Sequence, residues 1–292
     1  MILKLIAIAV GNTTAAYGAV CLWLYFNQTR LIFKPNQEVV AAQTADLSGY
    51  EDVWITPRSN SPGKIHGWWL PRQTAGELTL LYLHGNGENI GANLEHANRY
   101  RRMGFDVLLI DYRGYGRSPG PHPSEQRVYE DAIAAHRYLI QERQVSPQQL
   151  WLFGHSLGGA IAIDLATRQS VAGLIIQSSF SSMYQAVMAT ESYDWIPVRW
   201  LLHQHFDSLS KVPQLRVPTL YIHGLEDATT HPDMTVQLYQ QTSADKALWL
   251  VPEADHNDVA TVSGATYFTT IETFVEQTQT GNAIQPPRSP VE

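Results

Sequence analysis

The chain has 292 residues, of which 44% are hydrophobic, and its formal net charge is −7. This length and composition are enough for one sizeable core, and α/β folds of this size are commonly a single domain. The acidic balance leaves no basic footprint for a phosphate backbone, so we expect no nucleic-acid partner. The single cysteine, Cys21, cannot form an internal disulfide, and no Cys/His cluster has metal-ligand spacing. We therefore expect neither a metal nor a cofactor.

The chain begins with an apolar segment, residues 1–26, in which Lys4 is the only charged residue. Residues 5–29 carry no charge, and such a run is long enough to cross a hydrocarbon core that needs about 20 helical residues. We expect residues 1–26 to be an uncleaved transmembrane anchor, with a cleaved secretory signal as the alternative. A neck over residues 27–49 follows. The positive-inside bias places the rest of this single-pass membrane protein in the cytoplasm.

Residues 50–277 are expected to form one α/β domain. Two strands open it, at 50–56 and 64–71, and from residue 78 to 177 strands alternate with helices. This is the pattern of a mostly parallel sheet with helices on both faces. One covering helix is capped by Ser124 and has an apolar stripe at helical spacing from Val128 to Leu139.

The end of the domain is marked by an interruption and a last helix. Residues 178–215 break the alternation of strands and helices with aromatic residues set among polar ones. The strand pattern then resumes, and a helix near residues 265–275 closes the domain. The tail, residues 278–292, is expected to be disordered.

A pentapeptide at 154–158, GHSLG, follows the apolar run at 150–153 and precedes a strong helix pattern. A serine hydroxyl is a poor nucleophile, so the chain must turn sharply, expose the oxygen and bring a base to it. The small residues at 154, 158 and 159 allow that turn, because a side chain there would collide with a neighbouring strand or helix. Ser156 is therefore the candidate nucleophile. The alternative is a serine that merely caps the helix.

An acid and a histidine should follow the serine, in that order, each in a loop after a later strand. The strand pattern at 217–224 leads to Asp227, and the pattern at 246–252 leads to His256. Most other histidines precede the nucleophile, and the rest lie in the turn, at a strand end or around the acid loop. His256 is therefore the candidate base. The rivals of Asp227 are Glu226, Glu253, Asp255 and, less well placed, Asp164.

Acyl transfer also needs backbone N–H donors for the oxyanion of the transition state. The amide of Leu157 is one candidate, because it opens a helix whose first N–H groups have no partner. The other should come from the loop after the strand at 78–83, where glycines on both sides of Asn86 let backbone approach a ligand. The amide of Asn86 is the first choice and that of Gly87 the second. An ordinary turn is the alternative.

These motifs together resemble the α/β-hydrolase superfamily, and within it the membrane-anchored α/β-hydrolase-domain proteins grouped with serine aminopeptidase and monoacylglycerol-lipase-like sequences. The resemblance covers about residues 50–277. It is carried by LHGNGENI at 83–90, DYRGYGRS at 111–118, the pentapeptide, IHGLED at 222–227 and DHN at 255–257. It implies an α/β-hydrolase fold and a triad of Ser156, Asp227 and His256. It does not imply a substrate, because this scaffold hosts esterases, lipases, thioesterases and peptidases.

Residues 178–215 lie where such folds carry a cap over the active site, and they are short enough to be a partial lid. Two interpretations of their aromatic residues are open, an acyl-binding wall or the cap's own small core. The residues concerned are Tyr184, Tyr193, Trp195, Trp200 and Phe206. Arg113 and Arg117 could bind an anionic substrate group, although a structural or solvated role is favoured for both.

The sequence thus predicts a membrane-associated serine hydrolase that cleaves an ester or thioester, with a small-molecule or lipid acyl substrate and water as reactants. His256 takes the proton of Ser156 and then delivers it to the leaving group, while Asp227 orients the ring. Two alternatives are an aminopeptidase-type amide hydrolase and a non-catalytic, membrane-tethered lipid-binding or interaction protein. The acyl group and the oligomeric state are left open.

Overall fold

The computed structural model describes residues 1–40, 49–58, 61–190 and 192–284. Within these residues eight strands form one sheet, in the order β1-β2-β4-β3-β5-β6-β7-β8. β2 (Ile65–Leu70) is antiparallel to both its neighbours, β1 (Glu51–Ile55) and β4 (Phe105–Asp111). The other pairings are parallel. They run from β4 through β3 (Leu78–Leu83), β5 (Leu150–His155), β6 (Gly173–Gln177) and β7 (Thr219–Gly224) to β8 (Lys246–Val251), each strand paired with the next. The predicted mostly parallel sheet is confirmed.

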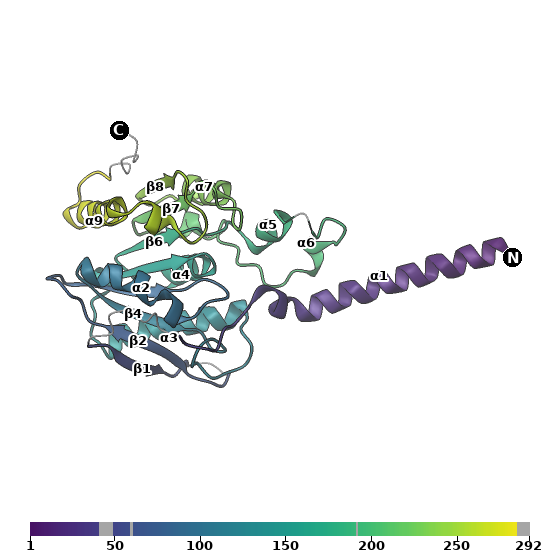
Figure 1. Ribbon diagram of the computed structural model, residues 1–292, viewed down its shortest axis with the longest axis horizontal. Coiled ribbons are helices and arrows are strands. Elements are labelled where there is room, and N and C mark those ends of the chain that lie inside the picture. The colour runs from purple at the N-terminus through teal and green to yellow at the C-terminus, as the bar shows by residue number, and fades with distance from the viewer. Residues whose placement is uncertain (41–48, 59–60, 191, 285–292) are drawn as a thin grey trace.

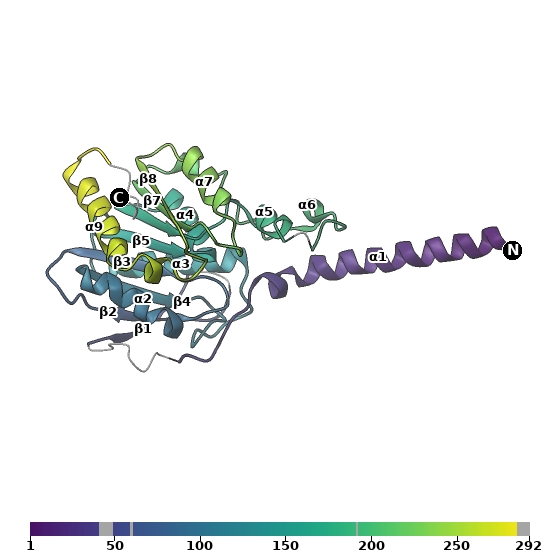
Figure 2. The same ribbon diagram turned by 45° about the horizontal axis from the view of Figure 1, so that its top comes forward.

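Helices cover both faces of this sheet (Figures 1 and 2). One face carries α3 (Glu125–Gln141), α4 (Leu157–Arg168) and α7 (Pro232–Gln241), and the other carries α2 (Ile90–Arg102), α8 (Val259–Val262) and α9 (Ala265–Thr280). Successive strand residues point to opposite faces, so Leu81 joins the first hydrophobic cluster and Leu80 the second. Strands buried on both sides are apolar throughout, which is why their sequences stand out.

The helix boundaries follow local signals. The side chain of Ser124 accepts a hydrogen bond from the amide of Arg127 and caps α3, as predicted. Helix α9 ends at Gly281, whose left-handed φ of 67° suits glycine. This end lies beyond the predicted one, because residues 278–280 form the last turn of α9 and are not part of a disordered tail. The remainder of the predicted tail from residue 285 lies outside the described residues.

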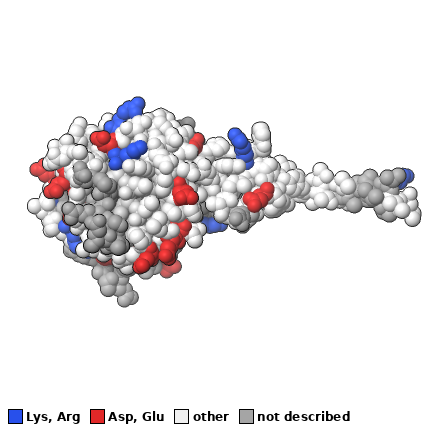
Figure 3. Space-filling model, turned by 90° about the horizontal axis from the view of Figure 1, so that it is seen from above, with Lys and Arg blue, Asp and Glu red and all other residues white. Residues whose placement is uncertain are grey.

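The N-terminal segment is one long helix, α1 (Ile2–Ile32), which projects from the domain (Figures 1 and 2). Figure 3 shows few charged side chains on the described part of this helix in the face in view. No helix in the described part of the chain combines the length and the apolar character needed to cross a membrane. The predicted transmembrane anchor and the single-pass membrane location are therefore wrong. The polar residues Asn12, Thr13 and Thr14 interrupt the apolar run on which that prediction rested.

The predicted neck is also different in the structure. Helix α1 continues past residue 26 to Ile32, and the residue that follows, Phe33, is only 1% exposed. The ring of Phe33 lies 6.0 Å from that of Phe206, measured between ring centroids. Gln28 of α1 and Phe33, which follows the helix, are both buried. The C-terminal end of α1 therefore packs against the domain, and residues 27–33 belong to the folded body.

Residues 178–215, the expected cap, contain α5 (Met183–Met188), α6 (Val198–Leu201) and a short 3₁₀ turn, Val212–Gln214. In both ribbon views α5 and α6 lie on the side of the domain from which α1 projects, alongside the C-terminal part of α1 (Figures 1 and 2). The carboxyl ends of the parallel strands, the cap residues and the end of α1 therefore meet at one side of the molecule.

Candidate active site

Ser156 lies in a strained turn between β5 and α4. Its φ and ψ are 53° and −116°, and a positive φ is uncommon for a residue with a Cβ. The turn is held on both sides of the residue. The Ser156 amide donates to Gln177 O at 2.9 Å, and its carbonyl accepts from Ser179 Oγ at 2.9 Å and from the Gly159 amide at 3.0 Å. Strained residues persist where the surroundings over-determine them, often at functional sites.

Two glycines permit this turn by close approach. A Cβ on Gly154 would overlap the carbonyl oxygen of Gly158, and a Cβ on Gly158 would overlap that of Leu83 in β3. Neither oxygen can move away without shifting a strand or the start of α4. The small residues predicted at these positions are therefore required by the packing.

His256 and Asp227 are joined by a hydrogen bond of 2.7 Å between Nδ1 and Oδ2. The two residues follow the adjacent parallel strands β7 and β8, so the sheet itself brings their loops together. The side chain of Asp227 is fully buried and that of His256 is 11% exposed. A histidine that donates its Nδ1 proton to a carboxylate keeps Nε2 free to accept a proton.

Asp227 is surrounded by donors. Its Oδ1 accepts the amides of Thr229 and Thr230, each at 2.8 Å, and its Oδ2 accepts Thr230 Oγ1 and His223 Nε2, each at 3.0 Å. Burial alone would raise the pKa of this carboxyl, but the hydrogen bonds from His223 and His256 outweigh it and hold the pKa well below its usual range. The group is thus a carboxylate at any pH near neutrality.

The rival acids lie elsewhere or have other partners. Glu226, Glu253 and Asp255 are exposed, and Asp255 Oδ1 accepts the amides of the two residues that follow His256. Asp164 is buried on α4, where Arg168 and Lys211 bind it at 2.9 Å and 2.8 Å. Of the predicted acids, Asp227 is the one that the structure brings to His256.

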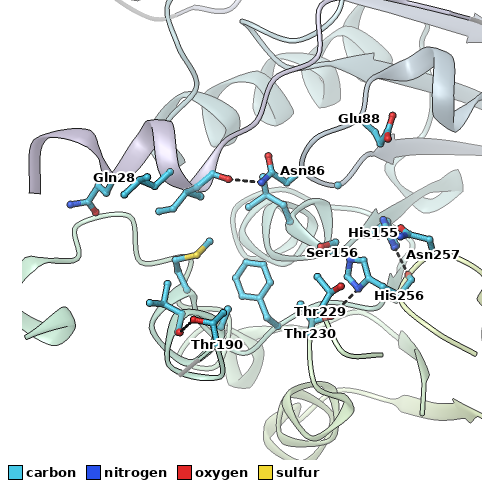
Figure 4. A pocket seen from close by; sticks show the side chains of 18 of the residues that line it. Gln28, Asn86, Glu88, His155, Ser156, Thr190, Thr229, Thr230, His256 and Asn257 are labelled. Carbon is cyan, nitrogen blue, oxygen red and sulfur yellow. Dashed lines mark hydrogen bonds between the residues drawn. The ribbon is translucent and has the colours of Figure 1, made fainter. Parts of the chain in front are cut away.

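Ser156 and His256 line a common cavity of about 940 Å³. Figure 4 shows the ring of His256 beside Ser156 at one end of this cavity. Among the described residues no hydrogen bond joins Ser156 Oγ to His256. Catalytic hydrogen bonds of this kind often tighten only when substrate binds.

The two predicted oxyanion residues line the same cavity. Leu157 is the first residue of α4, where amide groups have no partner inside the helix. Asn86 follows β3, and its side chain is fixed away from the sheet: Nδ2 donates to Ile32 O at the end of α1, and Oδ1 accepts the Lys34 amide at 2.9 Å and the Tyr115 hydroxyl at 2.8 Å. Gly87, the second choice, has a φ of 84° that suits the turn.

Two side chains that hold Asp227 are not predicted from the sequence, His223 and Thr230. His223 is the penultimate residue of β7, and its Nδ1 lies 2.6 Å from Thr235 Oγ1. A signal for Thr230 does exist, because an aspartate that binds the amides two and three residues later is a common turn pattern. His223 has no comparable local signal, since a buried strand end is an ordinary place for a histidine.

The expected cap aromatics mostly lie outside the cavity. Tyr193 lines it, whereas Phe206 is buried in the core, and Trp195 and Trp200 are 60% and 84% exposed. The wall formed by residues 178–215 is instead mainly aliphatic.

Arg113 and Arg117 lie in the structural or solvated settings that the sequence favoured. The Arg113 guanidinium is buried, with Nε 2.6 Å from Asp131 Oδ1 and a terminal nitrogen 2.9 Å from Glu130 Oε2. Arg117 is half exposed and lies 3.1 Å from Asp52 Oδ1. Both arginines are thus engaged in ion pairs.

Known proteins resemble this chain in sequence and in fold. Residues 76–210 match the family model described as "Serine aminopeptidase, S33". The uncharacterized protein Rv2307c of Mycobacterium tuberculosis is 31% identical over 89% of this chain and 92% of its own length. For the alpha/beta hydrolase domain-containing protein aho-3 of Caenorhabditis elegans the identity is 31%, over 83% of this chain and 68% of that protein.

Among solved structures, the esterase Pf2001 of Pyrococcus furiosus superposes with a TM-score of 0.67 at 18% identity, covering 84% of this chain and 98% of that one. At this identity the likeness concerns the fold, and it agrees with the sheet order and the strand-turn-helix around Ser156. On the sequence relatives and this architecture together, the chain belongs to the α/β-hydrolase superfamily.

Proposed function

We propose that this protein is a serine hydrolase that cleaves an ester or thioester through an acyl-enzyme intermediate. The observation that carries the proposal is the 2.7 Å hydrogen bond from His256 Nδ1 to the buried Asp227, at the cavity that Ser156 also lines. Membership in a superfamily of hydrolases supports it, although the superfamily alone does not name the bond that is cleaved.

In the proposed first half-reaction, Ser156 Oγ attacks the acyl carbon and His256 Nε2 accepts the hydroxyl proton. The negative charge that develops on the acyl oxygen is stabilised by the amides of Leu157 and Asn86. His256 then gives the proton to the leaving alcohol or thiol, and the acyl group remains on Ser156. In the second half-reaction His256 takes a proton from water, which attacks the acyl-enzyme, and the proton returns to Ser156 as the acid leaves.

Asp227 has two roles in this scheme. It keeps the proton of His256 on Nδ1, so that Nε2 faces the serine as an acceptor, and its charge stabilises the imidazolium formed during attack. The donors around Asp227, including His223 and Thr230, support both roles because they keep the carboxylate ionised and immobile.

The lining of the cavity favours an acyl substrate over an amine-bearing one. A free amino group in such a site would need a carboxylate to bind it. Among the described lining residues Glu88 supplies a carboxylate, and Figure 4 shows it pointing away from Ser156. The aminopeptidase-type alternative therefore becomes one arm of the test.

A fluorophosphonate probe tests the proposal, because it bonds covalently to an activated serine. We expect an adduct at Ser156 by peptide mass spectrometry, and none in Ser156→Ala. With p-nitrophenyl esters, Ser156→Ala and His256→Ala should lower kcat by about 10⁴ to 10⁶-fold. The control is Ser170→Ala, at an exposed serine, which should behave as the wild type.

The same assays include acyl thioesters and aminoacyl p-nitroanilides. Faster turnover of the anilides would replace the proposal by an amide hydrolase. Absence of both labelling and turnover on every substrate class would leave a non-catalytic binding protein.

A further inference from the structure

We propose that helix α1 sets the acyl-chain length that the enzyme accepts, because Leu24, Leu31 and Ile32 of α1 form one wall of the cavity that Ser156 also lines. The proposal rests on the hydrolysis proposed above. It assigns a specificity role to a helix that the sequence marks only as apolar.

The cavity runs without interruption from the candidate catalytic residues to α1. Its lining includes Ser156 and His256 as well as residues of α1. Figure 4 shows Gln28 at the end opposite His256. A substrate with its acyl carbon at Ser156 therefore extends its tail toward α1.

The far part of this cavity is built for an apolar chain. Besides the three α1 residues, the lining of the cavity includes aliphatic side chains of the cap: Met183, Val187, Ile196, Val198 and Leu201. A hydrocarbon tail gains from such surroundings, whereas a charged or hydroxylated tail would lose its water without compensation. Each methylene that enters should raise kcat/KM about three- to fourfold, until the chain meets α1.

Gln28 holds this part of α1 to the cap. Its Oε1 accepts the amides of His203 at 2.8 Å and Gln204 at 3.2 Å, and its Nε2 donates to Leu201 O at 3.1 Å. Gln28 is only 6% exposed. These three bonds hold the buried Gln28 side chain to the backbone of the cap, so the wall is fixed rather than loosely apposed.

Two further contacts fix the wall relative to Ser156. Ile32 O accepts a hydrogen bond from Asn86 in the proposed oxyanion loop, and Phe33 packs against Phe206 in the core. A wall held at the cap, the loop and the core has a defined distance from the reacting serine. A defined distance is what chain-length selection requires.

The test compares two identical substitutions on α1, Leu24→Trp and Leu22→Trp, in the full-length protein. Leu24 lines the cavity, whereas Leu22 is 61% exposed and is not among the described residues that line it. kcat/KM is measured for p-nitrophenyl esters from acetate to palmitate. We expect the optimum of Leu24→Trp to move to shorter chains, with the ratio of kcat/KM for the best wild-type chain to that for acetate falling at least about tenfold. Leu22→Trp should keep the wild-type profile.

A third variant, Leu31→Ala, enlarges the cavity and should move the optimum to longer chains. Poor folding of Leu24→Trp could lower kcat/KM without any change in selectivity. It would not explain a shift of the optimum to longer chains in Leu31→Ala. The proposal is overturned if Leu24→Trp and Leu22→Trp have the same chain-length profile, or if the optimum does not shift in Leu31→Ala. Either outcome would leave the proposed function intact as long as the fluorophosphonate labels Ser156. A wild-type protein that neither labels nor turns over any ester would instead overturn the proposed function itself.

Discussion

The hydroxyl of Tyr115 donates a 2.8 Å hydrogen bond to Asn86 Oδ1, the oxygen that also accepts the Lys34 amide. Burial raises the pKa of Tyr115, so this hydroxyl keeps its proton and remains a donor. Tyr115 belongs to the 111–118 motif, and Asn86 carries one of the two proposed oxyanion amides. The motif thus positions the oxyanion loop without itself lining the cavity.

Replacing Tyr115 with phenylalanine should therefore lower kcat for ester hydrolysis about three- to tenfold, which corresponds to the loss of one hydrogen bond. KM should change little, because the acyl cavity is untouched. Steady-state kinetics with one ester gives both constants. The control is Tyr221→Phe, which removes a buried hydroxyl bonded to Thr242 at 2.6 Å, far along the chain from Asn86. An equal fall in kcat in both variants would contradict the positioning role.

Asp227→Asn should lower kcat by about 10³ to 10⁴-fold while the protein stays folded. The amide nitrogen can donate to His256 Nδ1, and this favours the tautomer whose Nε2 carries the proton. Kinetics and thermal melting of the same preparation separate the two effects. Glu226→Gln and Asp255→Asn are the controls and should stay within about threefold of the wild type. If Asp227→Asn is active and one of the two control variants is inactive, the acid is the residue changed in that control.

The stability of the protein should fall between pH 6.5 and pH 4 in a way that depends on His155. Burial lowers the pKa of His155 to about 4, whereas a histidine in an unfolded chain has a pKa of about 6.5. In that window the unfolded chain binds a proton that the folded protein excludes. The free energy of unfolding therefore decreases as the pH falls, by an amount on the order of 2 to 3 kcal/mol.

Urea unfolding at several pH values measures this slope. His155 Nε2 lies 3.0 Å from His256 O, and glutamine at this position can also donate to that carbonyl without titrating. His155→Gln should therefore have a shallower slope than the wild type. Some slope should remain, because burial also lowers the pKa of His96. An unchanged slope in His155→Gln would show that His155 is not responsible.

Arg113→Met should lower the free energy of unfolding by about 3 to 5 kcal/mol, because it leaves Asp131 buried without its counter-charge. Both side chains of this pair are fully buried. The same change at Arg117, whose side chain is 50% exposed, should lower it by less than about 1 kcal/mol. Urea denaturation of the two variants makes the comparison. If both variants lose a similar amount of unfolding free energy, burial does not explain the difference expected between the Arg113 and Arg117 ion pairs.

Features that depend on local sequence could be predicted. The apolar run between Glu77 and His84 predicts β3 to the residue, and Ser124 predicts the start of α3. Ser156, Asp227 and His256 each follow a strand of the sheet, so their grouping follows from the order of parallel strands once the strands are recognised. Local signals and topology therefore account for the fold and for the candidate triad.

Features that depend on distant contacts could not be predicted. Gln28 bonds to Leu201, 173 residues away, and nothing around Gln28 signals that partner. Aromatic composition likewise could not distinguish Tyr193, which lines the cavity, from Trp200, which is exposed. The apolar sequence of α1 predicts a membrane anchor. The packing of α1 against the cap is a tertiary contact, and the sequence carries no signal for it.

The bonds of Gln28 also have a consequence for synthesis of the chain. Its partners Leu201, His203 and Gln204 lie 173 to 176 residues later. At about 5 to 20 residues per second, a ribosome needs roughly 10 to 35 seconds to supply them after Gln28. A helix forms in about a microsecond but is only marginally stable in isolation, so the face of α1 that meets the cap stays without this partner for most of translation. An N-terminal fusion partner that covers this face would compete with the cap for the end of α1, whereas one joined by a linker at Met1, which is 98% exposed, would not.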